Sequence, residues 1–543
     1  MREFAALYRE LDATTSTRAK RTALADYFRR AEAADAAWAV YFLSGGKPRQ
    51  AVPAKTLRAL AARAAGVADW LFEESYQAVG DLAETIALLL PAGRPLAEPL
   101  PLAVWVEQRL LALRALPAAE VESALLAWWD ELDAAERFVW NKLITGGFRV
   151  GVSRQLVVQG VAEACGLAPH LIAERLTGGF APSASAWRAL IDPQTAQGPG
   201  GRPYPFFLAQ ALTEAPQTLG PREDWAAEWK WDGIRAQIVR RAGGVFVWSR
   251  GEELVTDRFP EVSTIARALP EGCVVDGELV AWRDAAPAPF ALLQQRIARR
   301  TLSAAVLARA PVAFIAYDLL ERDGEDLRAQ PFSARRARLE QLLAELPAAA
   351  PGQPGFTVSP LVEAANWDEL ARIREQSRAR GVEGLMLKRR ASAYGAGRTR
   401  SSPLGEWWKW KIDPFAVDAV LVYAQRGHGR RASLYTDYTF ALWHDGALVP
   451  FAKAYSGLTD AEIAEVDAWI RRNTVEKFGP VRSVRPHFVC EVGFEGIAAS
   501  ARHKSGVAVR FPRILRLRTD KTVEQADTLA HLRDLARLSA PST

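Results

Sequence analysis

The chain has few sulfur-containing residues and few histidines. Its 543 residues include 3 Cys, 2 Met and 6 His. Cys165, Cys273 and Cys490 are too far apart in sequence for any zinc-binding spacing, and the histidines show no metal-ligand spacing either. We therefore expect no zinc site, and we expect the three thiols to be reduced and structural.

Long hydrophobic runs are also missing. The longest aliphatic stretches, such as IALLL near residue 86, reach about a quarter of the ~20 residues that a membrane-spanning helix needs. The opening residues MREFAALYRE carry charges of both signs, so they lack the uninterrupted apolar segment of a signal peptide. We expect no membrane helix, no membrane partner and a cytoplasmic location.

The composition is that of a soluble globular protein, with 49% hydrophobic and 24% charged residues. A chain of 543 residues is too long for one core and suggests two to four domains of about 150 residues each. The net charge of +6 is small for this length, and it does no more than permit an anionic partner.

Changes in local pattern divide the chain into three domains. Residues 1–195 show helical periodicity, and a linker rich in Pro and Gly, DPQTAQGPGGRPYP, follows at 192–205. Residues 196–413 alternate β-rich runs with helical ones, which predicts an α+β domain. Residues 414–543 contain several short strand-like runs with Gly-rich turns, which predicts a small barrel or sandwich.

The segment EWKWDGIR, residues 228–235, sets Lys230 between two tryptophans and two acids. A lysine acts as a nucleophile only where desolvation or neighbouring cations lower its pKa, and where a carbonyl or phosphoryl group is within reach. Most Lys-x-Asp-Gly strings are exposed turns. The segment becomes informative only together with the motifs downstream.

Three downstream strands are predicted to carry charged pairs. In VVDGELVAW, a strand period of two places Asp276 and Glu278 on one face, and their apolar surroundings predict burial beside a cation such as Mg²⁺. The same reasoning, applied to GVEGLMLKR, offers Glu383 and Lys388. In EWWKWKIDP, alternation places on one face two lysines, Lys409 and Lys411. Such a pair is usually solvated, but together with Lys230 and the acids it suits a triphosphate and its metal.

The C-terminal part contains a basic run opposed only by Asp520. A solvated face and a phosphate-binding surface both explain it. In RFPRILRLRTDK, alternation predicts that Leu515 and Leu517 point inward and that Arg516 and Arg518 point outward. The run consists of Arg502, Lys504, Arg510, Arg513, Arg516, Arg518 and Lys521.

A glycine-rich stretch in the helical region, TGGFRVGVSRQLVVQGV, precedes a predicted helix that Ser153 would cap. Such a helix start, with Arg149, Gly151 and Arg154 beside it, can hold a phosphate through backbone N–H groups. A purely structural loop explains the pattern equally well.

Seven segments of the chain occur in the order found in ATP-dependent DNA ligases, and the chain resembles that family from about residue 225 to 525. The segments are KWDGIR, SRGEELVTDRFPE, VVDGELVAW, FIAYDLLE, GVEGLMLKR, WWKWKIDP and RFPRILRLRTDK. The resemblance implies a multidomain protein with an all-α DNA-binding domain, an α+β nucleotidyltransferase domain of ATP-grasp-like type and a C-terminal OB-fold β-barrel. The length and KLITGGFRVGVSRQ are similar to bacterial three-domain enzymes linked to repair.

The resemblance also implies roles for individual residues. Lys230 would receive AMP from ATP, Glu228 would read the adenine amino group, and Tyr317 stands where the family usually has a stacking Phe. Arg235, Arg250, Arg400, Lys409 and Lys411 would contact ribose or phosphates, although the residues PLGE separate Arg400 from the following tryptophans. Glu278 and Glu383 would bind Mg²⁺, and Arg510, Arg513, Arg518 and Lys521 would orient pyrophosphate.

The implied function is the sealing of nicks with 3′-hydroxyl and 5′-phosphate ends through a lysyl-AMP intermediate. With a DNA substrate implied, DNA contact is the favoured interpretation of Arg149, Gly151, Ser153 and Arg154. The expected partner is nicked duplex DNA, with possible DNA-repair proteins, and the enzyme is expected to be a monomer near the nucleoid.

Two alternatives stay open at this point. An RNA ligase or a capping-type nucleotidyltransferase shares the lysine chemistry, but Glu228, the RFPR string and the long helical domain favour DNA and ATP. A non-catalytic nucleic-acid-binding protein would have lost catalytic groups, and the sequence retains them all.

Overall fold

The structure is a computed structural model, and it describes residues 1–47, 50–146, 148, 150–194, 201–283, 286–297, 299, 302–346, 355–396, 406–427 and 433–538. The chain forms two compact units. The first comprises Met1–Thr15, Gly45–Val152 and Asp413–Thr543, and the second comprises Ser16–Ser44 and Ser153–Ile412.

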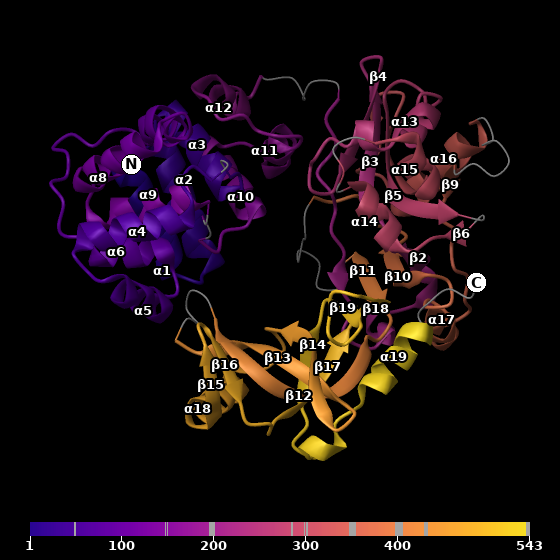
Figure 1. Cartoon of the computed structure of the whole chain (residues 1–543). Coiled ribbons are helices and arrows are strands. Elements are labelled where there is room, and N and C mark those ends of the chain that lie inside the picture. Colours follow the sequence, from indigo (N-terminus) through magenta and orange to yellow (C-terminus); the bar gives the residue numbers. More distant parts are fainter. Residues whose placement is uncertain are drawn as a thin grey trace. The chain divides into compact units, whose positions relative to one another are not determined.

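The N-terminal third is helical, as the sequence predicts (Figure 1). It supplies helices to both units. To the first unit it supplies α1 (Arg2–Ala13), α4 (Ala54–Ala65), α5 (Asp69–Val79), α6 (Leu82–Leu89), α7 (Leu102–Val104), α8 (Ala118–Asp130) and α9 (Ala134–Thr145). To the second unit it supplies α2 (Thr17–Arg30), α3 (Ala33–Leu43), α10 (Arg154–Cys165), α11 (Pro169–Leu176) and α12 (Ala184–Ile191). None of the helices in the described residues is long and apolar enough to span a membrane.

Side-chain caps fix where several of these helices begin. At α9, Asp133 accepts a hydrogen bond from the backbone N–H of Glu136, and the Glu136 side chain accepts one from the N–H of Asp133, which is a capping box. At α10, the Ser153 hydroxyl accepts a hydrogen bond from the N–H of Leu156 at 3.2 Å. The predicted Ser153 cap is therefore confirmed.

The second unit contains a four-stranded sheet and a seven-stranded sheet. The four-stranded sheet has the order β1 (Gln210–Ala211), β11 (Trp407–Lys411), β10 (Val382–Arg389), β2 (Trp225–Trp231). The main path of the seven-stranded sheet is β4 (Gly244–Ser249), β3 (Ile234–Arg241), β5 (Cys273–Arg283), β7 (Val312–Arg322), β8 (Glu325–Asp326), with β6 (Ala286–Pro287) on β5 and β9 (Phe356–Val358) on β7.

Buried side chains pack against both sheets. The helices that accompany the sheets are α13 (Pro260–Ala266), α14 (Phe290–Ile297), α15 (Ala304–Arg309), α16 (Phe332–Ala344) and α17 (Trp367–Glu375). One core cluster joins the two sheets, since it contains Ala226 and Trp407 from the smaller sheet and Val239, Val274 and Leu320 from the larger one. Strands of the two sheets are thereby held together, and polar side chains can meet between them.

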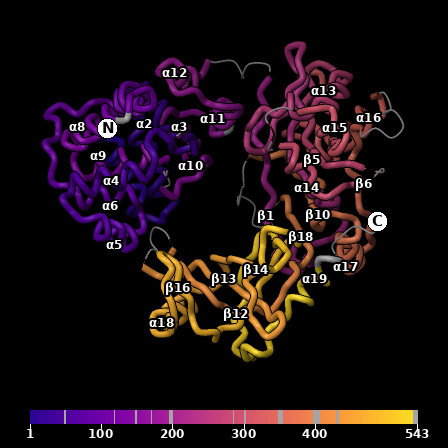
Figure 2. Tube along the Cα trace, viewed as in Figure 1, coloured from indigo at the N-terminus to yellow at the C-terminus, as the bar shows by residue number. Residues whose placement is uncertain are grey.

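The C-terminal part of the chain is rich in strands, as expected, and Figure 2 follows it in orange and yellow. Its main sheet has the order β14 (Ala447–Ala454), β13 (Tyr435–His444), β12 (Phe415–Arg426), β16 (Val481–Val484), β15 (Thr474–Phe478), and β17 (Val489–Phe494) joins β12 to β20 (Arg513–Leu517). The remaining elements are the hairpin β18 (Gly496–Ala499) and β19 (Val507–Arg510), and the helices α18 (Asp460–Asn473) and α19 (Leu529–Leu538).

The predicted alternation in β20 is wrong at Leu515. The register between β17 and β20 shifts between Glu491 and Val492, because a bulge interrupts the pairing. Ile514 is consequently the buried residue, at 2% exposure, whereas Leu515 is 39% exposed. Regular alternation cannot anticipate a bulge, and one extra residue is enough to move a side chain to the other face.

Candidate active site

Lys230 lies at the end of β2, where its ammonium forms an ion pair with Oε2 of Glu383. The Nζ atom of Lys411 lies 3.7 Å from the same carboxylate oxygen. Trp229 and Trp231, which flank Lys230 in sequence, pack into a core cluster with Leu385. The two indoles therefore anchor the strand, while the amine projects toward charged groups.

A bulge in β10 brings Glu383 to Lys230. Val382 pairs with Trp231 and Leu385 pairs with Trp229, so the register shifts around Glu383. In a regular strand, Glu383 and Lys388 would lie on opposite faces, because they are five residues apart. The bulge places both on the face of β2 that carries Lys230.

The lysines of β11 share this face. Lys409 pairs with Met386 and Lys411 pairs with Gly384, so both follow the alternation that the sequence predicts. The alternate residue Trp410 is buried and belongs to the core cluster of Trp229. Among the described residues, the smaller sheet thus presents on a single face the lysines Lys230, Lys388, Lys409 and Lys411 and the glutamates Glu228 and Glu383.

The larger sheet contributes Asp276 and Glu278, whose strand neighbours Val275 and Leu279 lie in the core on the other face. Asp276 is fully buried, and its cation is Arg235: Nε and Nη2 donate to its two oxygens at 3.2 and 2.7 Å. The expectation of a cation beside Asp276 is met by a side chain of the protein.

Arg235 is engaged mainly within the protein. Besides Asp276, it donates to the carbonyl oxygen of Phe207 at 2.5 Å and to the hydroxyl of Tyr394 at 3.2 Å. The Tyr394 hydroxyl in turn donates to Asp276 at 2.6 Å. Four of the five guanidinium N–H groups are therefore used among the described residues, and one is left for a ligand.

Glu278 and Glu383 lie near Lys230 and are the carboxylates that fit a metal ion. Burial raises the pKa of Glu278 to about 8, against the opposing influence of Lys230 and Arg235, and Asp276 and Glu383 raise it further. Crowded carboxylates of this kind are typical oxygen ligands for Mg²⁺, which completes its shell with phosphate oxygens and water. Among the described residues, no group of three or more His, Cys, Asp or Glu side chains is placed to hold a metal by itself.

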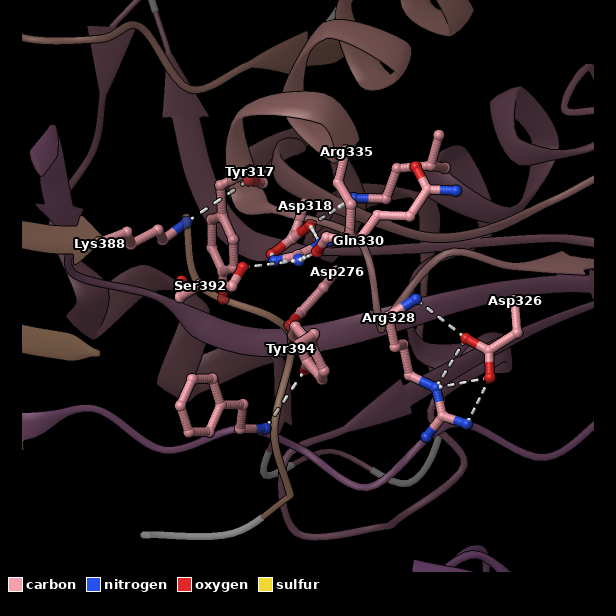
Figure 3. A network of polar contacts seen from close by, with 12 residues as sticks. Asp276, Tyr317, Asp318, Asp326, Arg328, Gln330, Arg335, Lys388, Ser392 and Tyr394 are labelled. Atoms are coloured by element: carbon pink, nitrogen blue, oxygen red, sulfur yellow. Dashed lines mark hydrogen bonds and ion pairs between the residues drawn. The ribbon is translucent and has the colours of Figure 1, made fainter. Parts of the chain in front are cut away.

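Glu228 is buried between two cations. Its Oε1 atom lies 2.5 Å from Nη1 of Arg336, and its Oε2 atom lies 2.5 Å from Nζ of Lys388. The Lys388 ammonium lies 4.3 Å from the centre of the Tyr317 ring, and Figure 3 shows it directed at the Tyr317 backbone. Burial lowers the pKa of Lys388, and Glu228 opposes that shift. Lys388 thus contacts both the residue predicted to read adenine and the residue predicted to stack on it.

Of the other two predicted phosphate or ribose contacts, the structure describes Arg250 alone. Arg250 is exposed in the turn after β4, where its backbone N–H donates to the carbonyl oxygen of Arg235. Arg400 lies outside the described residues.

Sequence reasoning missed the supporting layer of this site. Arg336 lies in ARRARLEQLLAEL, which the sequence identifies only as a helical run of the α+β domain, and the adjacent pair Arg335 and Arg336 is buried. Arg335 donates to both oxygens of Asp318, at 2.8 and 2.9 Å (Figure 3). The available signal was helical spacing, because the two arginines lie three and four residues after Phe332 and so fall on the buried stripe of the helix.

The cations predicted to orient pyrophosphate lie in and around β19 and β20, in the C-terminal part of the chain. Nη1 of Arg518 and Nζ of Lys521 both contact Oδ2 of Asp418, at 2.7 and 2.5 Å. Arg513 lies 3.5 Å from Glu495, whereas the Arg510 guanidinium lies over the ring of Phe511. Arg518 and Lys521 therefore converge on one carboxylate.

The predicted DNA-binding residues are described in part. Gly151 lies two residues before the Ser153 cap and has a φ of +62°. This angle falls in the left-handed region, which glycine adopts more readily than other residues. The Arg154 guanidinium forms an ion pair with Glu252. Arg149 lies outside the described residues.

Three family models match successive parts of the chain. The model described as DNA ligase N terminus matches residues 1–162, the ATP dependent DNA ligase domain matches 206–411, and the ATP dependent DNA ligase C terminal region matches 431–521.

Known proteins resemble the chain over nearly its whole length. A probable DNA ligase of Koribacter versatilis is 33% identical, with 97% of this chain and 95% of the relative covered. DNA ligase 1 of Korarchaeum cryptofilum is 29% identical, with 98% of each covered. The solved structure named Pmar-Lig_Pre covers 95% of this chain and 99% of its own, with a TM-score of 0.58 at 14% identity, which is a likeness of fold.

Proposed function

Because the chain belongs to the ATP-dependent DNA ligase family, we propose that Lys230 is the residue that carries AMP in its reaction. The enzyme seals nicks with ATP through a covalent lysyl-AMP intermediate, which is the function of this family. The observation that carries the assignment is the position of Lys230, which pairs with Glu383 and shares that carboxylate with Lys411. Cations and carboxylates in this arrangement suit a nucleoside triphosphate with its metal.

The chemistry consists of three transfers at phosphorus. The Lys230 ammonium loses a proton, and the resulting amine attacks the α-phosphorus of ATP. A P–N bond forms as the nitrogen loses a second proton, the bond to the β-phosphate breaks, and pyrophosphate leaves. A 5′-phosphate oxygen of the nick then attacks the AMP phosphorus and releases the lysine. Finally the 3′-hydroxyl attacks the activated 5′-phosphate, its proton is lost, and AMP leaves.

The residues around Lys230 act by positioning and by charge. Lys409 and Lys411 stabilise the charge that builds on the α-phosphate, and Arg250 and Arg400 contact phosphate or ribose. Glu278 and Glu383 hold Mg²⁺, which when bound neutralises charge on the phosphate oxygens. Arg235 mainly fixes Asp276 and offers its remaining N–H group to the ribose.

Different residues are assigned to the adenine end and the pyrophosphate end of ATP. Tyr317 stacks on the base, because its aromatic face replaces that of the usual Phe. Glu228 accepts a hydrogen bond from the adenine amino group. Arg518 and Lys521, with Arg510 and Arg513, orient the departing pyrophosphate when the C-terminal part closes over ATP.

The proposal also covers the domain boundaries, the fold of each domain, the DNA substrate and the cellular location. The helical domain spans 1–195, the ATP-grasp-like nucleotidyltransferase domain 196–413 and the OB-fold barrel 414–543. The substrate is duplex DNA with 3′-hydroxyl and 5′-phosphate ends at the nick, and Arg149, Gly151, Ser153 and Arg154 bind its backbone. The enzyme acts as a monomer at the nucleoid in the cytoplasm, in DNA repair and alongside repair proteins.

Covalent labelling tests the central assignment. With α-labelled ATP and Mg²⁺, the enzyme should acquire AMP through an acid-labile P–N bond, and Lys230→Ala should acquire none. Lys55→Ala, at an exposed position of α4, is the matched control and should label like the unaltered enzyme. Labelling of Lys230→Ala at full stoichiometry would refute the assignment. Nick sealing compared with ATP, NAD⁺ and GTP tests the nucleotide.

A further inference from the structure

Arg336 holds together three segments around the nucleotide-binding strand. It projects from α16, and its side chain is 7% exposed. Its Nη1 atom donates to Glu228 at 2.5 Å, its Nη2 atom donates to the carbonyl oxygen of Ser359, and its Nε atom donates to Glu340 at 2.7 Å. All three guanidinium nitrogens are therefore engaged, which fixes the guanidinium plane.

The contact with Ser359 extends the support to the other side of Lys230. The Ser359 hydroxyl accepts a hydrogen bond from the indole N–H of Trp231 at 3.0 Å, and Ser359 is fully buried. Arg336 thus contacts Glu228 directly, two residues before Lys230, and reaches Trp231 through Ser359, one residue after it. The geometry supports the strand on both sides of the nucleophile.

Lys388 holds the other oxygen of Glu228 from a confined position. Its ammonium lies 4.3, 4.8 and 4.6 Å from the ring centres of Tyr317, Phe332 and Trp407. An ammonium enclosed by aromatic faces is stabilised by the ring quadrupoles. Each carboxylate oxygen of Glu228 therefore has one fixed cationic partner, and each retains a second lone pair that can accept a hydrogen bond.

We infer that Arg336 is a positioning residue for base selection, because it holds Glu228 as an acceptor-only carboxylate directed at the 6-position of the purine. The adenine amino group donates a hydrogen bond to such a carboxylate. The 6-oxo group of guanine is itself an acceptor and is repelled. This inference rests on the proposed adenine-reading role of Glu228 and adds the residue that enforces it.

The test compares ATP with purine riboside triphosphate, which carries hydrogen in place of the 6-amino group. The measured quantity is the KM for formation of the lysyl-nucleotide. In Arg336→Met, the KM for ATP should rise about 10- to 100-fold, the range expected for a lost hydrogen bond to a charged group. The KM for purine riboside triphosphate should change little, because Glu228 has no amino group to bind there.

Two further variants separate this role from a general effect on the fold. Arg336→Lys keeps the positive charge and should restore part of the preference for ATP. Arg338→Met is the matched control on the same helix, since the Arg338 side chain is 38% exposed and pairs only with the exposed Glu325 among the described residues. It should leave both KM values unchanged. The KM ratio is measured within one preparation, so a lower fraction of folded protein does not alter it.

The outcomes are distinct. An equal rise in KM for both nucleotides would overturn the inference, because it would make Arg336 a support for the strand without a part in base selection. An unchanged KM for ATP would overturn it as well. Failure of the unaltered enzyme to form a lysyl-nucleotide with either triphosphate would instead refute the proposed role of Lys230.

Discussion

Asp418 and Arg518 form an ion pair at 2.7 Å that joins β12 to the segment after β20, and Lys521 contacts the same carboxylate oxygen at 2.5 Å. The side chain of Asp418 is 9% exposed, so its charge is compensated mainly by these two cations. One carboxylate therefore holds both Arg518 and Lys521, so the two cations proposed to orient pyrophosphate are positioned together.

The first prediction concerns these two cations. Arg518→Ala or Lys521→Ala should strongly reduce self-adenylylation, because each removes a cation from the pyrophosphate as its charge builds. Both variants should keep much of the sealing of a nick that already carries AMP, since no pyrophosphate leaves in that reaction. Gel assays of the two steps measure the separation.

Arg516→Ala is the control for this prediction. Arg516 is 62% exposed and pairs with Glu491 on the same part of the sheet, so its loss should spare self-adenylylation. Equal losses in both steps for Arg518→Ala would indicate a DNA contact or a folding role, and no loss in either step would indicate a solvated basic face.

The second prediction concerns Gly384, which follows Glu383 in the bulge of β10. Its φ is +130°, and a Cβ atom there would lie 2.4 Å from the carbonyl oxygen of Trp410. Gly384→Ala should therefore push β11 away and displace both Glu383 and Lys411. Self-adenylylation should fall at least as far as in Glu383→Gln. Gly446→Ala, also at positive φ but with no atom within 4 Å, should leave it intact.

Regular strands made part of the site predictable from the sequence. The shared face of Lys409 and Lys411 follows from a period of two, because β11 pairs without interruption. A period of two does not predict the common face of Glu383 and Lys388, because a bulge lies between these residues. A bulge also explains the wrong prediction for Leu515. Bulges depend on pairing with other strands, which local sequence does not encode.

Partners distant in sequence were beyond the reach of pattern reasoning. Arg336 lies 108 residues from Glu228, and Lys521 lies 103 residues from Asp418. An arginine in a helix is ordinarily assigned to the solvent, since burial of a charge is costly without a partner. Only the tertiary structure supplies that partner. The sequence therefore located the groups proposed to meet ATP and missed those that hold them.

The third prediction concerns the ion pair of Asp318 and Arg335, whose side chains are both fully buried. Removal of one partner leaves an uncompensated buried charge, which costs about 3–5 kcal/mol. Asp318→Asn or Arg335→Met should each lower the free energy of unfolding by about that amount, measured by urea titration of the transition that reports on the second unit. Arg338→Met, at an exposed pair, should change it by less than about 1 kcal/mol. A loss that small in the buried variants would contradict the prediction.

The fourth prediction concerns Arg154 at the first turn of α10. If its guanidinium contacts a DNA phosphate, Arg154→Ala should weaken nick binding for all sequences and reduce the slope of log affinity against log salt by about 1. Glu252→Gln removes the anion that pairs with Arg154, so it should preserve or increase the affinity. A salt slope that is unchanged in Arg154→Ala would assign the residue to the structural loop.

The last prediction concerns the metal that Glu278 and Glu383 are proposed to hold. EDTA should abolish self-adenylylation, and excess Mg²⁺ should restore it. Glu278→Gln and Glu383→Gln should each raise the Mg²⁺ concentration for half-maximal rate, because an amide oxygen is a weaker ligand than a carboxylate for a hard cation. Glu345→Gln, at an exposed carboxylate that pairs with Arg322, should keep the original requirement. Glu383 also pairs with Lys230, so its replacement removes a partner of the nucleophile as well as a ligand. A lower maximal rate with an unchanged Mg²⁺ requirement in Glu383→Gln would therefore assign it to the lysine and leave Glu278 as the metal ligand.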